Sequence, residues 1–94
     1  MKLETLGKAK EEILKIEPSA EVILYGSRIS NLLVLVEGEV DNNRNDRISH
    51  TLREIESDTG ESLCGIVQSR SMWEDPRYQI TPLFKKIRLE GITI

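Results

Sequence analysis

The sequence predicts an α/β (α+β) fold, in which a small mixed sheet of three to four strands is flanked by helices. Strand-like and helical segments alternate in the order helix, strand, strand, helix, strand, helix. The first two strand segments are joined by only a few residues. We expect them to be antiparallel, because a parallel pair needs a crossover of about a dozen residues or more. A helix separates the second and third strands, so these can run parallel and make the sheet mixed.

The first half of the chain supplies one helix and two strands. Residues 3–16 have the periodicity of an amphipathic helix, and Pro18 ends it. The apolar face of this helix is formed by Leu3, Leu6, Ala9, Ile13 and Ile16. Residues 20–25 and 32–36 are continuous apolar runs, which are typical of strands buried on both faces. Gly38 breaks the chain after the second run.

A second helix is expected from about residue 43 to residue 59. Its apolar residues Ile48, Leu52 and Ile55 are spaced i, i+4, i+7 and form a single stripe. Gly60 is suited to cap its C-terminus, since glycine readily adopts the left-handed conformation found there. Residues 62–68 then predict a third, shorter strand.

The last part of the chain predicts one more helix. Residues 69–80 are expected to form a loop or a short helical turn. Thr81 and Pro82 are a strong helix start, with threonine as the N-cap and proline at the first helical position. Gly91 closes this helix, and residues 92–94 are expected to add a short edge strand.

Length, charge and apolar content restrict the class of protein. Ninety-four residues predict a single domain, residues 1–94. A net charge of -3 makes a nucleic-acid partner improbable, because such partners normally require a basic surface. No apolar run approaches the roughly 20 residues that span a bilayer, so no membrane partner is expected. The charged start of the chain is unlike a secretory signal, and we expect a cytoplasmic location.

The titratable residues predict no zinc site. One cysteine and one histidine are too few for a structural zinc site in a single chain. Cys64 lies in an apolar stretch, which predicts a buried and inert thiol. His50 is expected to be solvated or at a boundary. The acidic residues of the second helix alternate with arginines, which indicates a solvated face rather than a metal cluster: Asp41, Asp46, Glu54, Glu56 and Asp58.

The most informative motif lies between the first two strands. The apolar run ends at Gly26, Ser27 and Arg28, and a second apolar run follows at once. Glycine and serine at the end of a buried strand offer backbone amides and a hydroxyl, which can bind an anion such as phosphate. The same residues are equally common in a plain hairpin turn. Taken alone, the motif leaves both interpretations open.

The order of several motifs resembles a known family. Residues 23–28, Ile-Leu-Tyr-Gly-Ser-Arg, resemble the signature of the nucleotidyltransferase domain of the DNA polymerase beta superfamily, in its bacterial stand-alone, minimal type. Residues 32–36 resemble the strand that follows the family's Asp-x-Asp motif. Residues 69–74 and 84–92 are similar to later segments of these proteins, in the same order.

This resemblance implies a function and a set of ligands. Members of the family transfer a nucleoside monophosphate from a nucleoside triphosphate, such as ATP, to a hydroxyl acceptor, with magnesium held by carboxylates. By resemblance, Gly26 and Ser27 would bind the triphosphate and Arg28 would flank it. Bacterial relatives often act as antitoxins, which implies either a small helical toxin-like protein partner or a homo-oligomer.

The metal-binding half of the family motif is absent from the sequence. Only four residues, 28–31, connect the Gly-Ser pair to the second apolar run, and Ile29 and Asn31 stand where the family has its aspartates. The third strand contains no carboxylate, although Glu61 precedes it. Magnesium prefers anionic oxygen ligands, so we expect the chain to bind it poorly. Either this protein has lost the segment, or the natural chain carries residues that this sequence lacks.

These departures leave three functions open. The first is nucleotide transfer with magnesium. The second is a catalytically degenerate binding or antitoxin module on the same fold, and the third is an oligomerising domain without a nucleotide site. Trp73 and Tyr78 are compatible with stacking on a base, although such aromatic residues more often anchor a loop to the core or form a partner surface.

Overall fold

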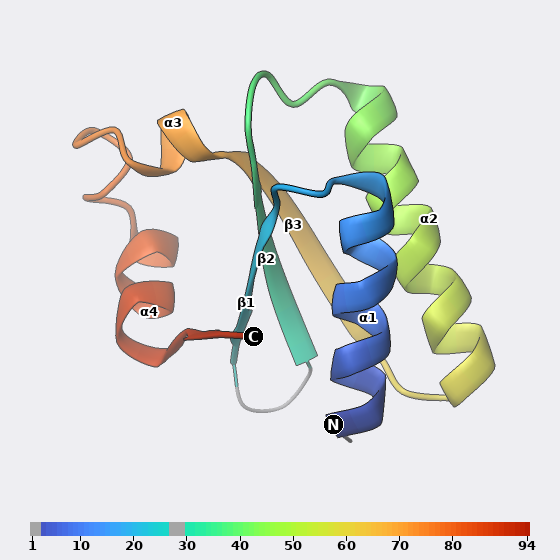
Figure 1. The fold of residues 1–94 in the computed structure, drawn as a ribbon. Coiled ribbons are helices and arrows are strands. Elements are labelled where there is room, and N and C mark those ends of the chain that lie inside the picture. Colours follow the sequence, from blue (N-terminus) through green and yellow to red (C-terminus); the bar gives the residue numbers. More distant parts are fainter. Residues whose placement is uncertain (1–2, 27–29) are drawn as a thin grey trace.

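The computed structural model describes residues 3–26 and 30–94, and in these residues helices cover both faces of a sheet (Figure 1). The chain starts with a helix and a β-hairpin, continues through a helical crossover, and ends with two helices and a short strand. The elements in chain order are α1 (Leu3–Ile16), β1 (Glu21–Tyr25), β2 (Ser30–Val36), α2 (Asn42–Thr59), β3 (Leu63–Ser69), α3 (Arg70–Trp73), α4 (Pro82–Glu90) and β4 (Ile92–Thr93).

The described strands form one mixed sheet in the order β3-β2-β1-β4. β1 is antiparallel to both β2 and β4, whereas β2 and β3 are parallel. The predicted fold class, the antiparallel first pair and the parallel second pair are therefore confirmed. The helix α2 supplies the crossover that a parallel pair requires.

The second strand begins earlier than expected, at Ser30 instead of residue 32. Asn31 is paired with Tyr25 of β1 on one side and with Cys64 of β3 on the other. The ladder thus continues through residues that the sequence assigned to the connector. The apolar run alone predicts a strand from residue 32, because Ser30 and Asn31 are polar.

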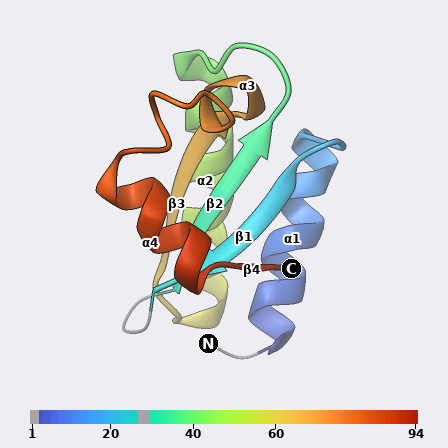
Figure 2. The same cartoon turned by 90° about the vertical axis from the view of Figure 1, so that its left-hand side faces the viewer.

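The two faces of the sheet carry separate apolar cores. α1 and α2 cover one face, and α4 lies across the other (Figures 1 and 2). The core under α1 and α2 includes the predicted stripe of α2 and alternate residues of β2: Ala9, Ile13, Val22, Leu32, Val34, Val36, Ile48, Leu52, Ile55 and Leu63. The core under α4 is smaller and contains Tyr25, Leu33, Leu35 and Ile87.

Side chains and a glycine cap the ends of α2 and α4. The caps at Gly60 and Thr81 were predicted from the sequence. The Asp41 side chain accepts a hydrogen bond from the Arg44 amide at the start of α2. Gly60 ends this helix with a φ of 73°, in the left-handed region that favours glycine. At the start of α4, the Thr81 hydroxyl accepts from the Phe84 amide, as expected for an N-cap threonine.

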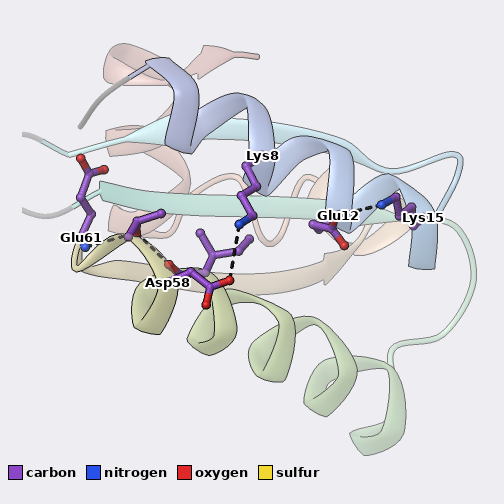
Figure 3. Close-up of polar contacts among 7 residues, drawn as sticks. Lys8, Glu12, Lys15, Asp58 and Glu61 are labelled. Atoms are coloured by element: carbon purple, nitrogen blue, oxygen red, sulfur yellow. Dashed lines mark hydrogen bonds and ion pairs between the residues drawn. The ribbon is translucent and has the colours of Figure 1, made fainter.

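Polar contacts join α1 to α2 on the outside of the first core. The Lys8 ammonium lies 3.4 Å from an Asp58 carboxylate oxygen, as the dashed line in Figure 3 shows. Lys15 pairs with Glu12 within α1.

None of the described helices is both long and apolar enough to cross a membrane.

Candidate functional site

The candidate site lies at the end of the sheet where β1 stops and both β2 and β3 start. β1 is antiparallel to the other two, so its carboxyl end meets their amino ends. Gly26 follows β1 directly and has a φ of 84°. Only glycine adopts this conformation without strain, and both a phosphate-binding turn and a plain hairpin turn make use of it. The predicted phosphate ligands Ser27 and Arg28, together with Ile29, lie outside the described residues.

Three side chains form a row across this end of the sheet. Asn31 is the register partner of both Tyr25 and Cys64. Directly paired residues place their side chains on the same face. Tyr25 belongs to the core under α4, so the whole row lies on that face. The row therefore brings together a phenol, an amide and a thiol, and contains no carboxylate.

Tyr25 is the most buried member of the row, with 7% of its surface exposed. This burial raises the pKa of the Tyr25 phenol above its ordinary value. Electrostatic interactions with Cys64 and Tyr78 raise the pKa of the Tyr25 phenol further. The phenol thus stays protonated at physiological pH and can act as a hydrogen-bond donor.

Cys64 is exposed, so the prediction of a buried thiol is wrong. The physical reason is its position on an edge strand, on the face that α4 covers. The neighbours of Cys64 face the other side of the sheet, under α2. Leu63 is buried there, and a Cβ atom added at Gly65 would meet Leu52 of α2. At Cys64 the layer formed by α4 does not extend far enough to exclude water. The apolar stretch around Cys64 could not predict its exposure, because burial at this position depends on which helix reaches that end of the sheet.

The residues of the row do not fit a magnesium site. Magnesium takes anionic oxygen ligands, and Asn31 offers only a neutral amide. The partner of Asn31 on β3 is Cys64, whose sulfur is a soft ligand that suits magnesium poorly. Nowhere among residues 3–26 and 30–94 do three histidine, cysteine or acidic side chains come close enough to hold a metal ion.

Glu61 is a carboxylate at the same end of the sheet. It lies two residues before Leu63, which is opposite Ser30 at the start of β2. Figure 3 shows its side chain extending from the connection between α2 and β3. Its Oε2 atom is buried and has no hydrogen-bond partner in the described part of the chain. The sequence singled out Glu61 as the carboxylate nearest to the third strand, and one carboxylate alone does not complete a metal site.

The aromatic segment after β3 serves as an anchor. Trp73 is half-buried, and its ring centroid lies 4.7 Å from that of Phe84 and 5.6 Å from that of Tyr78. Of the alternatives that the sequence left open for Trp73 and Tyr78, these contacts favour the anchoring of a loop to the core. Next to them lies a hollow of about 310 Å³, which is lined by Met72, Asp75, Arg77, Tyr78 and Thr81.

A second polar cluster closes the opposite end of the same face. The Arg70 Nη1 atom donates to Glu21 at 2.9 Å, and its Nε atom donates to Glu37 at 2.8 Å. These bonds connect the end of β3 to the start of β1 and the end of β2. Sequence reasoning missed this cluster, because the three residues are distant along the chain. The cluster is an ion-pair network and leaves the Arg70 guanidinium occupied by carboxylates.

The remaining predicted polar positions are solvated. His50 is exposed and lies 2.9 Å from Glu54, one helical turn along α2. Asp58 pairs with Lys8, and Asp41 caps its helix. The acidic face of α2 is therefore a solvated surface, as predicted.

The chain matches no known family model, no curated protein and no solved structure. The motif resemblance to nucleotidyltransferases is thus an expectation drawn from short segments of the sequence. The site itself offers a glycine turn, a row of neutral donors and acceptors, and one orphaned carboxylate oxygen.

Proposed function

We propose that this protein is a catalytically degenerate nucleotidyltransferase-like module, which binds a nucleoside triphosphate or a partner protein without transferring a nucleotide. The observation that carries the proposal is the row of Tyr25, Asn31 and Cys64. By the resemblance, Asn31 stands at the position of a family aspartate, and none of the three side chains in the row is a carboxylate.

The geometry around the row supports binding without metal-dependent chemistry. A phosphate group approaching the end of β1 would meet the backbone at Gly26, which has a positive φ. The protonated phenol of Tyr25 can donate a hydrogen bond to an anionic oxygen. The described residues supply no set of ligands for a metal ion at this end of the sheet.

The module is proposed to act in the cytoplasm as an antitoxin-like protein. The resemblance to bacterial stand-alone nucleotidyltransferases supports a small helical toxin-like protein as its partner. Binding measurements on the purified protein with a small helical protein of this kind test this part of the proposal.

Calorimetric titration with ATP, with and without magnesium, tests the nucleotide part of the proposal. We expect binding of ATP whose affinity changes little when magnesium is added. Asn31→Asp adds a second carboxylate to the end of the sheet where Glu61 lies, and should make the affinity depend on magnesium. Cys64→Ser is the matched control, because it changes a side chain of the same row without adding charge.

Two results would overturn the proposal. Transfer of label from α-labelled ATP to an acceptor by the unmodified protein would establish the enzyme. Absence of any heat with ATP, in both the unmodified protein and Asn31→Asp, would leave an oligomerising domain without a nucleotide site. Gly26→Ala should weaken ATP binding under the proposal, because alanine is strained at a positive φ.

A further inference from the structure

The outer edge of β3 is a long, unprotected sheet edge. β3 has seven residues and lies at one end of the strand order, as the outermost strand beside β2 (Figure 2). Within the described residues, the backbone groups on its outer side make no hydrogen bond to another segment. Edge strands with free N–H and C=O groups are templates for pairing with another strand.

The sequence of β3 lacks the usual protection of an edge. From residue 62 to residue 69 there is no charged residue and no proline. Lysine, proline and very short length are the common devices that prevent pairing at an edge. The opposite edge of the sheet uses one of them, since β4 has only two residues. The contrast indicates that the edge of β3 is kept available for an occupant.

A hollow between β3 and α2 provides self-complementary charges beside this edge. It measures about 150 Å³ and is lined by Ser49, Leu52, Arg53, Glu56, Leu63, Cys64 and Gly65. Arg53 and Glu56 carry opposite charges and are three residues apart on α2. Neither makes an ion pair within the described part of the chain.

We propose that β3 pairs antiparallel with β3 of a second copy of this chain, around a two-fold axis perpendicular to the sheet. Such an axis places the same surface of both copies in contact. It also sets the two α2 helices side by side and antiparallel, so that Arg53 of each copy faces Glu56 of the other. The reciprocal charge pair favours a second copy over an unrelated strand, which would have to supply matching charges. The inference goes beyond the proposed function and does not depend on it.

Charge reversal on α2 tests the dimer without altering β3. In Arg53→Glu, the new glutamate of each copy faces Glu56 of the other copy across the axis. In Glu56→Arg, the new arginine of each copy faces Arg53 of the other copy. Each variant alone should raise the dimer dissociation constant by about tenfold or more, because like charges across an interface repel. An equimolar mixture of the two variants should dimerise again, since each then meets the opposite charge. Light scattering during size-exclusion chromatography measures these states.

Two exposed positions on α4 provide matched controls. Lys86→Glu and Glu90→Arg make the same charge changes far from the hollow and should leave the dimer unchanged. Hydrogen exchange adds an independent measurement, and the amides of residues 63–69 should exchange more slowly as the protein concentration rises. A monomer at every accessible concentration would overturn the proposal. So would a dimer that survives both single reversals, or one whose β3 amides exchange at an unchanged rate.

Discussion

The guanidinium of Arg44 donates to both carboxylate oxygens of Glu17, at 2.9 Å from Nε and 2.8 Å from Nη2. Arg44 lies in the first turn of α2, and Glu17 immediately follows α1. Both side chains are largely shielded from water, with 23% and 15% of their surfaces exposed. The bidentate pair therefore fixes the end of one helix to the start of the other, over the core that both helices share.

Replacement of Glu17 by glutamine should lower stability in a pH-dependent way. The hydrogen bond from Arg44 holds the pKa of the Glu17 carboxyl below its ordinary value. The pair therefore stabilises the fold above the ordinary carboxyl pKa, and this contribution is lost as the pH falls through the lowered value. We expect Glu17→Gln to cost roughly 1–2 kcal/mol at neutral pH, measured by urea unfolding.

The matched control for this prediction is Glu12→Gln. Glu12 pairs with Lys15 on the exposed surface of α1, so its loss should have little effect. The difference between wild type and Glu17→Gln should shrink as the solution is acidified. A difference of constant size down to acid pH would show that the charge of Glu17 is not the cause.

Gly65→Ala should destabilise the protein by crowding the core under α2. A Cβ atom at this position would overlap the Cδ1 atom of Leu52, which is buried and would have to shift. We expect a loss of about 1–3 kcal/mol in thermal or urea unfolding. Gly7→Ala is the matched control, because a Cβ atom there meets nothing within 4 Å. That change should stabilise α1 by about 0.5–1 kcal/mol.

A double-mutant cycle locates the clash of Gly65→Ala. Leu52→Ala alone should cost about 2–5 kcal/mol, because it opens a cavity. Combined with Gly65→Ala, it should cost less than the sum of the two single changes, since the overlap disappears. Additive losses would indicate that the methyl group is accommodated elsewhere.

Trp73→Ala should loosen the segment between β3 and α4. The ring packs against Phe84 and Tyr78, and its removal takes away the contacts that hold this segment on the sheet. We expect a loss of roughly 2 kcal/mol, which is less than for a fully buried tryptophan. Met72→Ala, at a neighbouring residue that is 52% exposed, should change stability little. Circular dichroism during urea unfolding compares both variants, and equal stabilities would contradict the anchoring role of Trp73.

Tyr25 should titrate at a higher pH than an ordinary tyrosine. Its pKa is raised because the phenol is buried, so its absorbance change on ionisation should come late in an alkaline titration. The contribution of this group to stability is full below the ordinary pKa of tyrosine and is lost as the pH rises through the raised value. In Tyr25→Phe the late component should disappear. A late component that persists in this variant would assign it to another tyrosine.

The sequence predicted the elements better than the site. The apolar stripe of α2, its cap at Gly60 and the start of α4 at Thr81 all depend on residues within one or two helical turns. The row at the end of the sheet depends on the register between three strands, which apolar runs alone do not reveal. Apolar character alone therefore assigns the polar residue Asn31 to the connector, although Asn31 pairs with both neighbouring strands of the sheet.

By itself, the sequence determined the order of the elements, the antiparallel hairpin and the parallel crossover pair. These follow from local periodicity and from the lengths of the connections, which nearby residues control. Only the tertiary structure decided that Cys64 is exposed, that Gly65 must leave room for Leu52, and that Arg44 reaches Glu17. Each of these depends on which helix covers which part of a sheet face. That coverage is set by packing between segments far apart in the chain, and no local pattern encodes it.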